Sequence, residues 1–590
     1  MASTSNGHGS LEPAAPPRGL PGERPIAWLG LLVLCTLMGY AAMAPIANPD
    51  LGWHVALGRL IVESGSIPDT EPFTHTARGA PMVAHEWLSQ VAYQGVIELL
   101  GVLGLRWANA SLTLLVLVLF FAMLRRAGAA PALALLGVGL YAVIAQPRFQ
   151  LRPHMFNLAF AMAMYGYLFV RRPALEGRQL ANAFAATLLW VNMHSGAVLL
   201  AALLALHLAA EVIDQKLGRR QARARDLGGG DLRRLAVLLA LVAVALLITP
   251  NHLRLFPYLI ETARLNARLS LEWFPIIESW DSAIKPPVAM SCFWLVAAAT
   301  AATAWLTRRR QPLSRLAVVL FAAWLPIHSQ RFVWVYFIPL LFTLGELARW
   351  LHQRQGAAAP PRWTPARALS PLIALAVLVA ISYATLVAPI PWAHLGHRFR
   401  AARNFRPAVF PVEAIEFLDQ VDLEGPLFNA NKWGGYILMH TYDKYPIFID
   451  GRWVTIGESV LLDSYHVSRR LPRSFEILDA YGIEILLVHR GWMTAELLRT
   501  QKWIPVFENW NSGLYLRDRP RSAANLERCA AYYRVRGIPF DEKRGFDERA
   551  AFLANRAWAE RFGVRRVHLN QFGAHGRRLG AGATRPVEGW

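Results

Sequence analysis

The chain has 590 residues, of which 54% are hydrophobic and only 17% are charged. Soluble domains carry about 25% charged residues. This composition, with its many apolar runs of about 18 residues, excludes an ordinary soluble enzyme and indicates a polytopic membrane protein. Much of the net charge of +21 comes from Lys and Arg in short loops between those runs, which is typical of membrane topology and argues against nucleic acid as a partner. Cys35, Cys292 and Cys529 are far apart and predict no disulfide framework.

The N-terminal segment, residues 1–26, is rich in Gly, Pro, Ala and Ser, which predicts a disordered cytoplasmic N-terminus. The first apolar run follows at 27–47. A signal peptide is one interpretation, because Ala42-Met43-Ala44 offers small residues near its end. The length of about 20 residues favours an uncleaved anchor. Either interpretation places Asp50 outside the cytoplasm.

Later apolar runs predict a bundle of about eleven membrane spans over residues 27–390. After the first, the spans are expected at 107–124, 131–146, 155–170, 180–195, 197–214, 235–249, 288–306, 313–327, 332–348 and 370–390. The segment 86–104 carries Glu86 and Glu98 and has apolar residues at helical spacing. We expect it to be a helix in the membrane interface, within a first extracytoplasmic loop at 48–106.

Basic residues test this topology. With the N-terminus inside, clusters such as Arg125-Arg126 and Arg308-Arg309-Arg310 fall in cytoplasmic loops, as the positive-inside rule requires. A membrane span at 86–104 would put them outside. An odd number of spans then places everything after residue 390 outside the cytoplasm.

The C-terminal part changes character and predicts an extracytoplasmic α/β domain at 400–518. Helices are expected at 411–420 and 459–470, and strands at 426–430, 435–439, 446–450, 483–489, 503–507 and 513–516. Residues 519–590 are rich in Arg, Ala and Gly and are expected to form two short helices and then a disordered basic tail.

Polar residues gather where the predicted spans reach the outer side. The set comprises Asp50, Trp53, His54, His85, Glu86, Arg148, Arg152, His154, Asn192, His194, Glu272 and Arg331. Polar side chains at membrane depth are costly and favour a functional interpretation. The alternative is that they snorkel to water or cap helix ends. Their convergence on one rim beside Asp50 favours a site.

The chemistry of this rim is specific. Arginines with no partner acids nearby suit a phosphate or pyrophosphate, and Arg148, Arg152, His154 and Arg331 are the candidates. A single carboxylate, Asp50, suits a general base that takes a proton from an attacking hydroxyl or amine. Tryptophans beside an acid suit a sugar ring. The combination predicts glycosyl transfer from a lipid-phosphate sugar, with arginine charge stabilising the leaving phosphate.

Six short strings, together with the architecture over about 30–520, resemble a bacterial branch of the polytopic GT-C glycosyltransferases. The strings are Asp50-Leu51-Gly52-Trp53-His54, Val83-Ala84-His85-Glu86-Trp87-Leu88, Trp190-Val191-Asn192-Met193-His194-Ser195-Gly196, Leu271-Glu272-Trp273, Trp433-Gly434-Gly435-Tyr436 and Phe448-Ile449-Asp450-Gly451-Arg452. The resemblance implies a polyprenyl-phosphate-linked sugar donor, contact with membrane lipids, and an extracytoplasmic glycan, lipid or protein acceptor. With the composition, it predicts a location in the bacterial inner membrane.

Carried over by position, Asp50 matches the loop acid that serves as base, and Glu86 matches a second acid near the lipid phosphate. Asp50 and Glu86 are therefore the candidate catalytic residues. We expect Trp53, His54, His85, Asn192, His194 and Glu272 to contact substrate. Many GT-C enzymes have paired acids in this loop, whereas this chain has Asn48-Pro49-Asp50, which weakens a metal site. No cofactor is predicted with certainty. A divalent cation on Asp50, His54, His85 and Glu86 is the one candidate.

Other classes of function stay open. A transporter of a lipid-linked or anionic solute would tend to show internal repeats and sites in mid-membrane, and neither is evident. A non-catalytic scaffold in envelope assembly would use the C-terminal domain. In that domain, Trp433, Asp450 and Arg452 are consistent either with acceptor binding or with a turn and packed aromatics.

Overall fold

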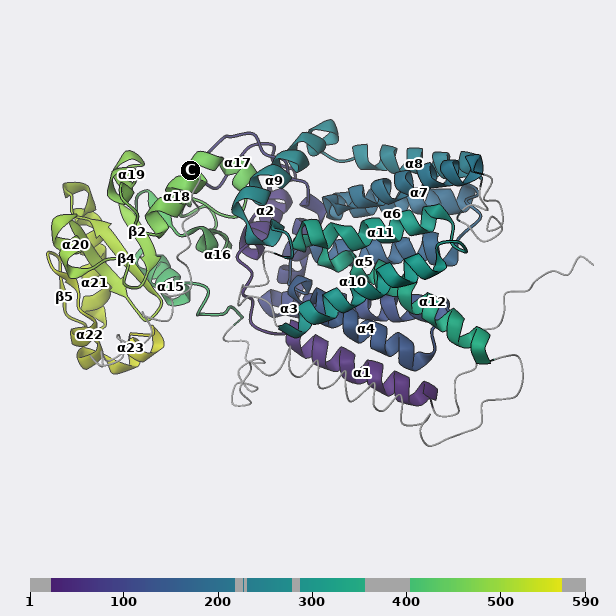
Figure 1. Cartoon of the computed structure of the whole chain (residues 1–590). Helices are drawn as coiled ribbons and strands as arrows, with labels where there is room; N and C mark the ends of the chain where they lie inside the picture. The colour runs from purple at the N-terminus through teal and green to yellow at the C-terminus, as the bar shows by residue number, and fades with distance from the viewer. Residues whose placement is uncertain (1–22, 218–226, 228–230, 278–286, 356–403, 565–590) are drawn as a thin grey trace, which may run out of the picture. The chain divides into compact units, whose positions relative to one another are not determined.

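The computed structural model describes residues 23–217, 227, 231–277, 287–355 and 404–564 (Figure 1). They divide into two compact units. The membrane unit comprises residues up to Asp69 and Pro81–Asn404, and the C-terminal unit comprises Thr70–Ala80 and everything from Phe405. The predicted first loop therefore divides, because its residues 70–80 pack with the C-terminal unit.

The membrane unit is a bundle of helices (Figure 1). Its helices are α1 (Glu23–Ala42), α2 (Leu51–Ser64), α3 (Trp87–Arg126), α4 (Pro131–Ala145), α5 (His154–Tyr165), α6 (Gly177–Met193), α7 (Val198–Lys216), α8 (Leu232–Leu247), α9 (Leu255–Leu269), α10 (Pro287–Thr307), α11 (Leu313–His328) and α12 (Phe337–Gln355). One apolar core draws residues from each of these helices except α2. At its centre the rings of Phe120, Tyr141 and Phe337 are fully buried and lie 5.2–6.4 Å apart.

The chain is a multi-pass helical membrane protein. Helices occupy every predicted span except 370–390, which lies outside the described residues, as do residues 1–22 of the predicted N-terminal segment. Five described helical segments are long and apolar enough to cross a bilayer, and α8 with α9 would make a sixth despite a 96° bend. The five are Trp87–Arg126, Pro131–Arg148, Ser195–Lys216, Val288–Thr307 and Gln330–Gln353.

The long helix α3 breaks at Gly101, whose φ of 65° and ψ of −174° are not helical. A glycine adopts this backbone conformation without steric cost. The break separates the segment expected in the membrane interface from the segment expected to span. Leu99 and Leu100, just before the break, are 83% and 66% exposed.

The C-terminal unit contains a four-stranded mixed sheet in the order β1-β2-β4-β3. Strand β1 (Leu427–Asn429) runs parallel to β2 (Ile485–His489), and β2 and β3 (Trp503–Glu508) both pair antiparallel with β4 (Ser512–Arg517). The helices around it are α15 (Val412–Val421), α16 (Gly434–Thr441), α17 (Trp453–Ile456), α18 (Glu458–Ser468), α19 (Ser474–Ala480), α20 (Ala495–Thr500) and α21 (Ala523–Val535). The apolar run in β2 is buried on both faces, as its composition predicts.

Two predictions for this unit are wrong. Residues 435–439 form helix α16, and residues 446–450 make only an isolated bridge at Ile447 instead of a strand. Residues 519–564 are folded, with α21 followed by α22 (Glu548–Ala554) and α23 (Arg556–Arg561). Leu526, Cys529 and Tyr533 lie on one face of α21 and are buried, and the Tyr533 hydroxyl donates to the Val506 carbonyl at 2.7 Å. The rest of the predicted tail, 565–590, is outside the described residues.

Candidate functional site

Asn48 and Asp50 are joined by a hydrogen bond at the start of the first loop. The Asn48 amide donates to the Leu151 carbonyl at 3.0 Å, and its Oδ1 accepts the backbone N–H of Asp50 at 2.9 Å. Asn48 is buried, so water does not compete for these bonds. An ionised aspartate at this position would accept but not donate. The amide in place of a paired acid therefore fixes Asp50 beside the Leu151 segment.

Asp50 belongs to a chain of ion pairs. Its Oδ2 lies 2.9 Å from Nη2 of Arg152. Nη1 of Arg152 lies 3.3 Å from Oε1 of Glu272, and Nη1 of Arg148 lies 3.3 Å from Oε2 of the same carboxylate. The expectation that these arginines lack partner acids is wrong, because Glu272 bridges both of them.

The ion pairs keep the central groups charged. Burial alone raises the pKa of Glu272, but Arg152 and Arg148 outweigh it and hold this pKa well below its usual range. Burial lowers the pKa of Arg152, but the carboxylates of Asp50 and Glu272 outweigh that effect and raise it. Opposite charges at short range favour the charged form of each partner.

Among these three arginines, Arg331 is the one that forms no ion pair with a carboxylate of the described residues. It lies in the 3₁₀ turn Gln330–Tyr336, and its guanidinium is 4.9 Å from the Trp273 ring. No carboxylate in the described part of the chain lies within ion-pair distance of it. The Nε atoms of Arg148 and Arg152 are buried and have no hydrogen-bond partner among the described residues. The cluster therefore keeps cationic donors that its own acids do not satisfy.

A second cluster surrounds Glu86, which is 7% exposed. Nε2 of His194 lies 3.2 Å from Oε1 of Glu86, and Nε2 of His85 lies 3.7 Å from the same atom. Nε2 of His54 lies 3.7 Å from Oε2. Burial raises the pKa of Glu86 despite the nearby positive charge of His85. Three imidazoles thus converge on one buried carboxyl group.

Close packing of α2 on α3 brings His54 to Glu86. Any side chain at Gly58, one turn after His54, would collide with the Gln90 carbonyl on α3. Gln90, one turn after Glu86, places its Nε2 3.2 Å from Nδ1 of His54. Trp53 is 8% exposed and its ring lies 3.5 Å from that of His54. Trp53 is thus packed into the core, where it offers little surface to a sugar.

His154 lies at the start of α5. Its Nε2 contacts the Arg148 carbonyl at 2.5 Å. The contact is to the backbone of the Arg148 turn, so in this structure it shapes the loop that carries the arginine.

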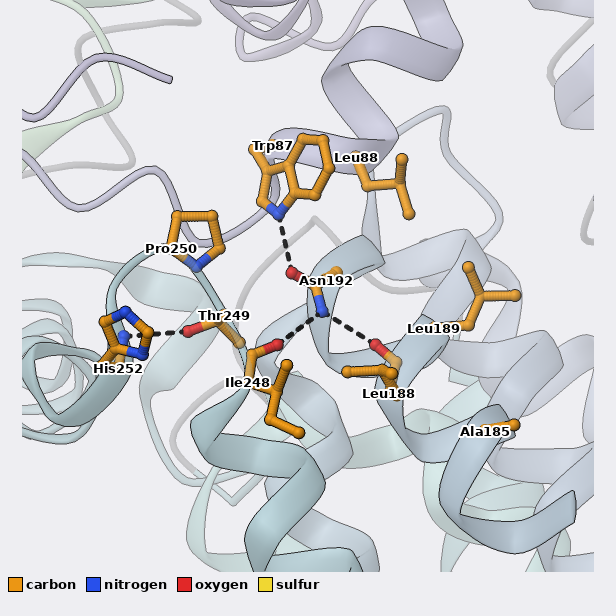
Figure 2. A pocket seen from close by; sticks show the side chains of 10 residues that line it. All are labelled: Trp87, Leu88, Ala185, Leu188, Leu189, Asn192, Ile248, Thr249, Pro250 and His252. Atoms are coloured by element: carbon orange, nitrogen blue, oxygen red, sulfur yellow. Dashed lines mark hydrogen bonds between the residues drawn. The ribbon is translucent and has the colours of Figure 1, made fainter. Parts of the chain in front are cut away.

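An apolar cavity of about 530 Å³ lies next to the Glu86 cluster in sequence and in space. It is lined by Trp87, Leu88, Ala185, Leu188, Leu189, Asn192, Ile248, Thr249, Pro250 and His252 (Figure 2). Asn192 accepts from Nε1 of Trp87 at 2.8 Å and donates to the Leu188 and Ile248 carbonyls. Asn192 therefore links α3, α6 and the end of α8, and its side-chain oxygen and nitrogen are occupied by these structural hydrogen bonds.

The candidate cation site is not assembled as predicted. Among the described residues, no group of three or more His, Cys, Asp or Glu side chains is arranged to hold a metal ion. His54 and His85 face Glu86, whereas Asp50 pairs with Arg152. A divalent cation therefore stays a prediction of the sequence alone.

In the C-terminal unit, Trp433, Asp450 and Arg452 are buried, at 0%, 0% and 6% exposure. Arg452 pairs with Asp450 at 2.6 Å and also with Glu71, from the segment 70–80. Any side chain at Gly434 would collide with the Ile449 carbonyl. These groups contact one another, which supports the structural interpretation of the two strings over acceptor binding.

Three residues that contact the site are not among the predicted catalytic, phosphate-binding and substrate-binding residues. The sequence shows Asn48 only as an amide at a position where many GT-C enzymes have an acid, whereas in the structure its side chain accepts the backbone N–H of Asp50. Gln90 faces His54, and its spacing of four from Glu86 on one helix was the available signal. The Asn251 amide donates to the Ala84 carbonyl at 3.2 Å beside His85, and no local pattern indicates that contact.

Comparison with solved structures found the archaeal oligosaccharyltransferase AglB from Archaeoglobus fulgidus, in complex with an inhibitory peptide and a dolichol-phosphate. The TM-score is 0.52 at 10% identity, over 78% of this chain and 69% of AglB. ArnT from Cupriavidus metallidurans, bound to undecaprenyl phosphate, matches with a TM-score of 0.46 at 16% identity, over 84% of this chain and 98% of ArnT. No family model and no curated protein matches the sequence. The likeness to AglB shows that this chain shares the fold of that protein.

Proposed function

We propose that this protein is an integral membrane glycosyltransferase that moves a sugar from a polyprenyl-phosphate donor to an extracytoplasmic acceptor. The observation that carries the proposal is the contact of Asp50 with Arg152, inside a cluster that also holds Arg148 and Arg331. In such a cluster at one end of a membrane bundle, the carboxylate can take a proton from a nucleophile, and the arginines can stabilise a leaving phosphate. The GT-C fold supports this class of reaction. We further propose a bacterial inner-membrane location, with the N-terminus in the cytoplasm and the C-terminal unit outside.

The donor phosphate is assigned to the arginines. Arg331 has no carboxylate partner among the described residues, and Nε of Arg148 and Arg152 have spare donor capacity. Guanidinium groups match phosphate oxygens in geometry and charge, and the pair gains strength away from bulk water. Glu272 holds two of the three guanidiniums in place. The phosphate would complete the charge balance of the cluster.

The isoprenoid chain of the donor is assigned to the apolar cavity beside Trp87. Its lining is aliphatic except for Trp87, Asn192, Thr249 and His252. An isoprenoid chain that moves from the bilayer into this cavity stays in apolar surroundings, so it would be held there by packing contacts rather than by removal from water. The cavity neighbours the Glu86 cluster through Trp87 and Asn192, so a lipid held there could present its phosphate at the rim.

In the proposed reaction, Asp50 takes the proton from the acceptor hydroxyl or amine. The acceptor atom forms a bond to the anomeric carbon, and the bond between that carbon and the phosphate oxygen breaks, leaving its electron pair on the oxygen. Arg152 contacts Asp50 and would also contact the phosphate, so it links the two ends of the reaction. Its charge stabilises the developing negative charge.

The test uses the full-length protein in lipid nanodiscs, with labelled polyprenyl-phosphate sugars in the presence and absence of candidate acceptors. We expect sugar transfer, or slow hydrolysis without acceptor, and loss of both in Asp50→Asn. Full activity of Asp50→Asn would remove Asp50 from the mechanism. Movement of label across vesicles without transfer would point to transport. The absence of both transfer and transport would point to a scaffold.

A further inference from the structure

Gln330 connects two turns that carry charged residues of the site. It follows α11 and begins the 3₁₀ turn Gln330–Tyr336. Its side-chain amide donates to the Leu271 carbonyl, and its backbone N–H donates to the Phe274 carbonyl at 3.0 Å. These carbonyls belong to the first residue of the 3₁₀ turn Leu271–Trp273 and to the residue after that turn. One residue therefore holds both ends of a turn that is distant in the chain.

The bond to Leu271 matters because Glu272 is the next residue. A peptide bond is planar, so the Leu271 carbonyl and the Cα atom of Glu272 lie in one plane. A donor that fixes this carbonyl thereby fixes the point from which the Glu272 side chain extends. The Phe274 N–H also faces the carbonyl, but its distance of 3.4 Å is longer than the usual value of about 3.0 Å. The Gln330 amide is therefore the closer donor to this carbonyl.

Arg331 lies on the other side of the connection, directly after Gln330. Its guanidinium is 4.9 Å from the ring of Trp273, which belongs to the Leu271–Trp273 turn. The Trp273 ring also meets the Phe332 ring edge to face, with centroids 6.4 Å apart. A guanidinium over an indole ring is an attractive arrangement. The two turns thus contact each other through side chains as well as through hydrogen bonds.

The connection continues toward α11. The backbone N–H of Ile276 donates to the Ile327 carbonyl at 3.3 Å. Together with the bond from Gln330 to Phe274, it joins two segments that run in antiparallel order. Ser329 and Gln330 are only 3% and 8% exposed, so water competes little for the hydrogen bonds at this end of α11. The two turns are therefore held together as one unit.

We propose that Gln330 is a positioning residue of the phosphate-binding cluster. Glu272 holds the guanidiniums of Arg148 and Arg152. Gln330 fixes the turn of Glu272 against the turn of Arg331, so its amide sets the spacing among all three guanidiniums. The inference rests on the proposed glycosyl transfer, in which these guanidiniums receive the donor phosphate. Gln330 acts through its neighbours in this reaction.

Two substitutions isolate the amide. Gln330→Met keeps the length of the side chain and removes the donor to Leu271, whereas Gln330→Asn keeps an amide on a side chain that is shorter by one methylene. Both leave the backbone N–H at this position in place. The matched control is Gln311→Met, because Gln311 precedes α11 at its other end and its amide donates to Glu346 at 2.7 Å. A thermal unfolding curve close to that of the wild type verifies that each variant is folded.

The first experiment needs no turnover. Hydrogen exchange of the full-length protein in nanodiscs, followed by mass spectrometry, measures the opening of residues 270–277. We expect these amides to exchange about 10-fold faster in Gln330→Met and in Gln330→Asn, because the turn loses the bond that holds its first carbonyl. Exchange equal to that of the wild type would overturn the clamp. An equal increase in Gln311→Met would overturn it as well.

The second experiment is a double-mutant cycle on sugar transfer. We expect Gln330→Met to lower kcat/KM for the lipid donor by about 10-fold, as small displacements of binding groups commonly do. Added to Glu272→Gln, the same substitution should lower kcat/KM by less than about threefold, because the carboxylate that the amide positions is already absent. Equal falls in both backgrounds would show a general structural effect and would overturn the positioning role.

The two experiments separate this inference from the proposed function. If the wild type transfers no sugar, the proposed function fails, and the role of Gln330 in positioning a donor phosphate fails with it. Hydrogen exchange then still decides whether the Gln330 amide joins the two turns. If the wild type transfers sugar and the cycle is additive, the proposed function stands and the positioning role alone is overturned.

Discussion

Glu272 lies 3.3 Å from Arg152, although 120 residues separate them in the chain. The same carboxylate also holds Arg148, so one acid from a loop after α9 orients two cations from the turn between α4 and α5. The arginines are thereby placed before any donor arrives. Such preorganisation allows charges to act on a leaving group without reorientation.

Glu272→Gln tests this preorganisation. The amide keeps the size of the side chain but loses its charge, so both guanidiniums lose their strongest constraint. We expect kcat/KM to fall by about 10²-fold, as small displacements of reacting groups commonly cause. Steady-state transfer assays measure this. Glu261→Gln is the matched control, because Glu261 pairs with Arg264 on an exposed part of α9; an equal fall in the control would contradict the assignment.

Arg331→Gln tests the phosphate assignment. A charge-assisted hydrogen bond is worth about 1.5–3 kcal/mol, so loss of the guanidinium should weaken binding of polyprenyl phosphate by roughly 10- to 100-fold. Isothermal titration of the protein in nanodiscs measures the Kd. Arg264→Gln serves as a control, since Arg264 is exposed on α9. An unchanged Kd in Arg331→Gln would assign the phosphate elsewhere.

Asn48→Asp tests the role of the amide. The substitution resembles a paired-acid motif, but it removes the donor to the Leu151 carbonyl and places a second negative charge next to Asp50. We expect the free energy of unfolding to fall by about 1–3 kcal/mol and activity to drop. Chemical denaturation and transfer assays give the two values. A gain of metal-dependent activity would instead show that the position can serve a cation site.

Arg452→Met tests the buried charges of the C-terminal unit. Arg452 pairs with Asp450 and Glu71, and all three are buried. Removal of the cation leaves two uncompensated carboxyl groups, which should destabilise this unit by about 3–5 kcal/mol. Unfolding of the full chain, followed by tryptophan fluorescence, measures the change. Adding Glu71→Gln should recover part of the loss, and no recovery would argue against direct coupling.

The raised pKa of Glu86 makes a pH prediction with a definite sign. Burial favours its protonated form in the folded state, so the folded protein binds more protons than the unfolded chain between the ordinary pKa of about 4.3 and the raised one. In that window the contribution of Glu86 to stability falls as pH rises. The free energy of unfolding of Glu86→Gln minus that of the wild type should therefore increase with pH above about 4.3. A difference independent of pH would contradict the shift.

The pattern of apolar runs was enough to predict the helical bundle and the rim where the polar residues gather. Hydrophobicity and helical period are local properties, and a bilayer demands them in each span separately. Strands β2, β3 and β4 were predicted for the same reason, because a run of β-branched and aromatic residues indicates a buried strand without information from other segments. Residues 435–439 form a helix and not the predicted strand. Any side chain at Gly434, where this helix begins, would collide with the Ile449 carbonyl, a contact between separate segments that the local pattern does not show.

The sequence by itself thus determined a multi-pass membrane protein with acids, histidines and arginines at one rim. The tertiary structure alone decided which groups meet. It paired Arg152 with both Asp50 and Glu272, turned three imidazoles toward Glu86, and packed residues 70–80 with the C-terminal unit. Charge pairing and tautomers depend on distances of a few ångströms between segments far apart in the chain, and no local pattern of residues encodes those distances.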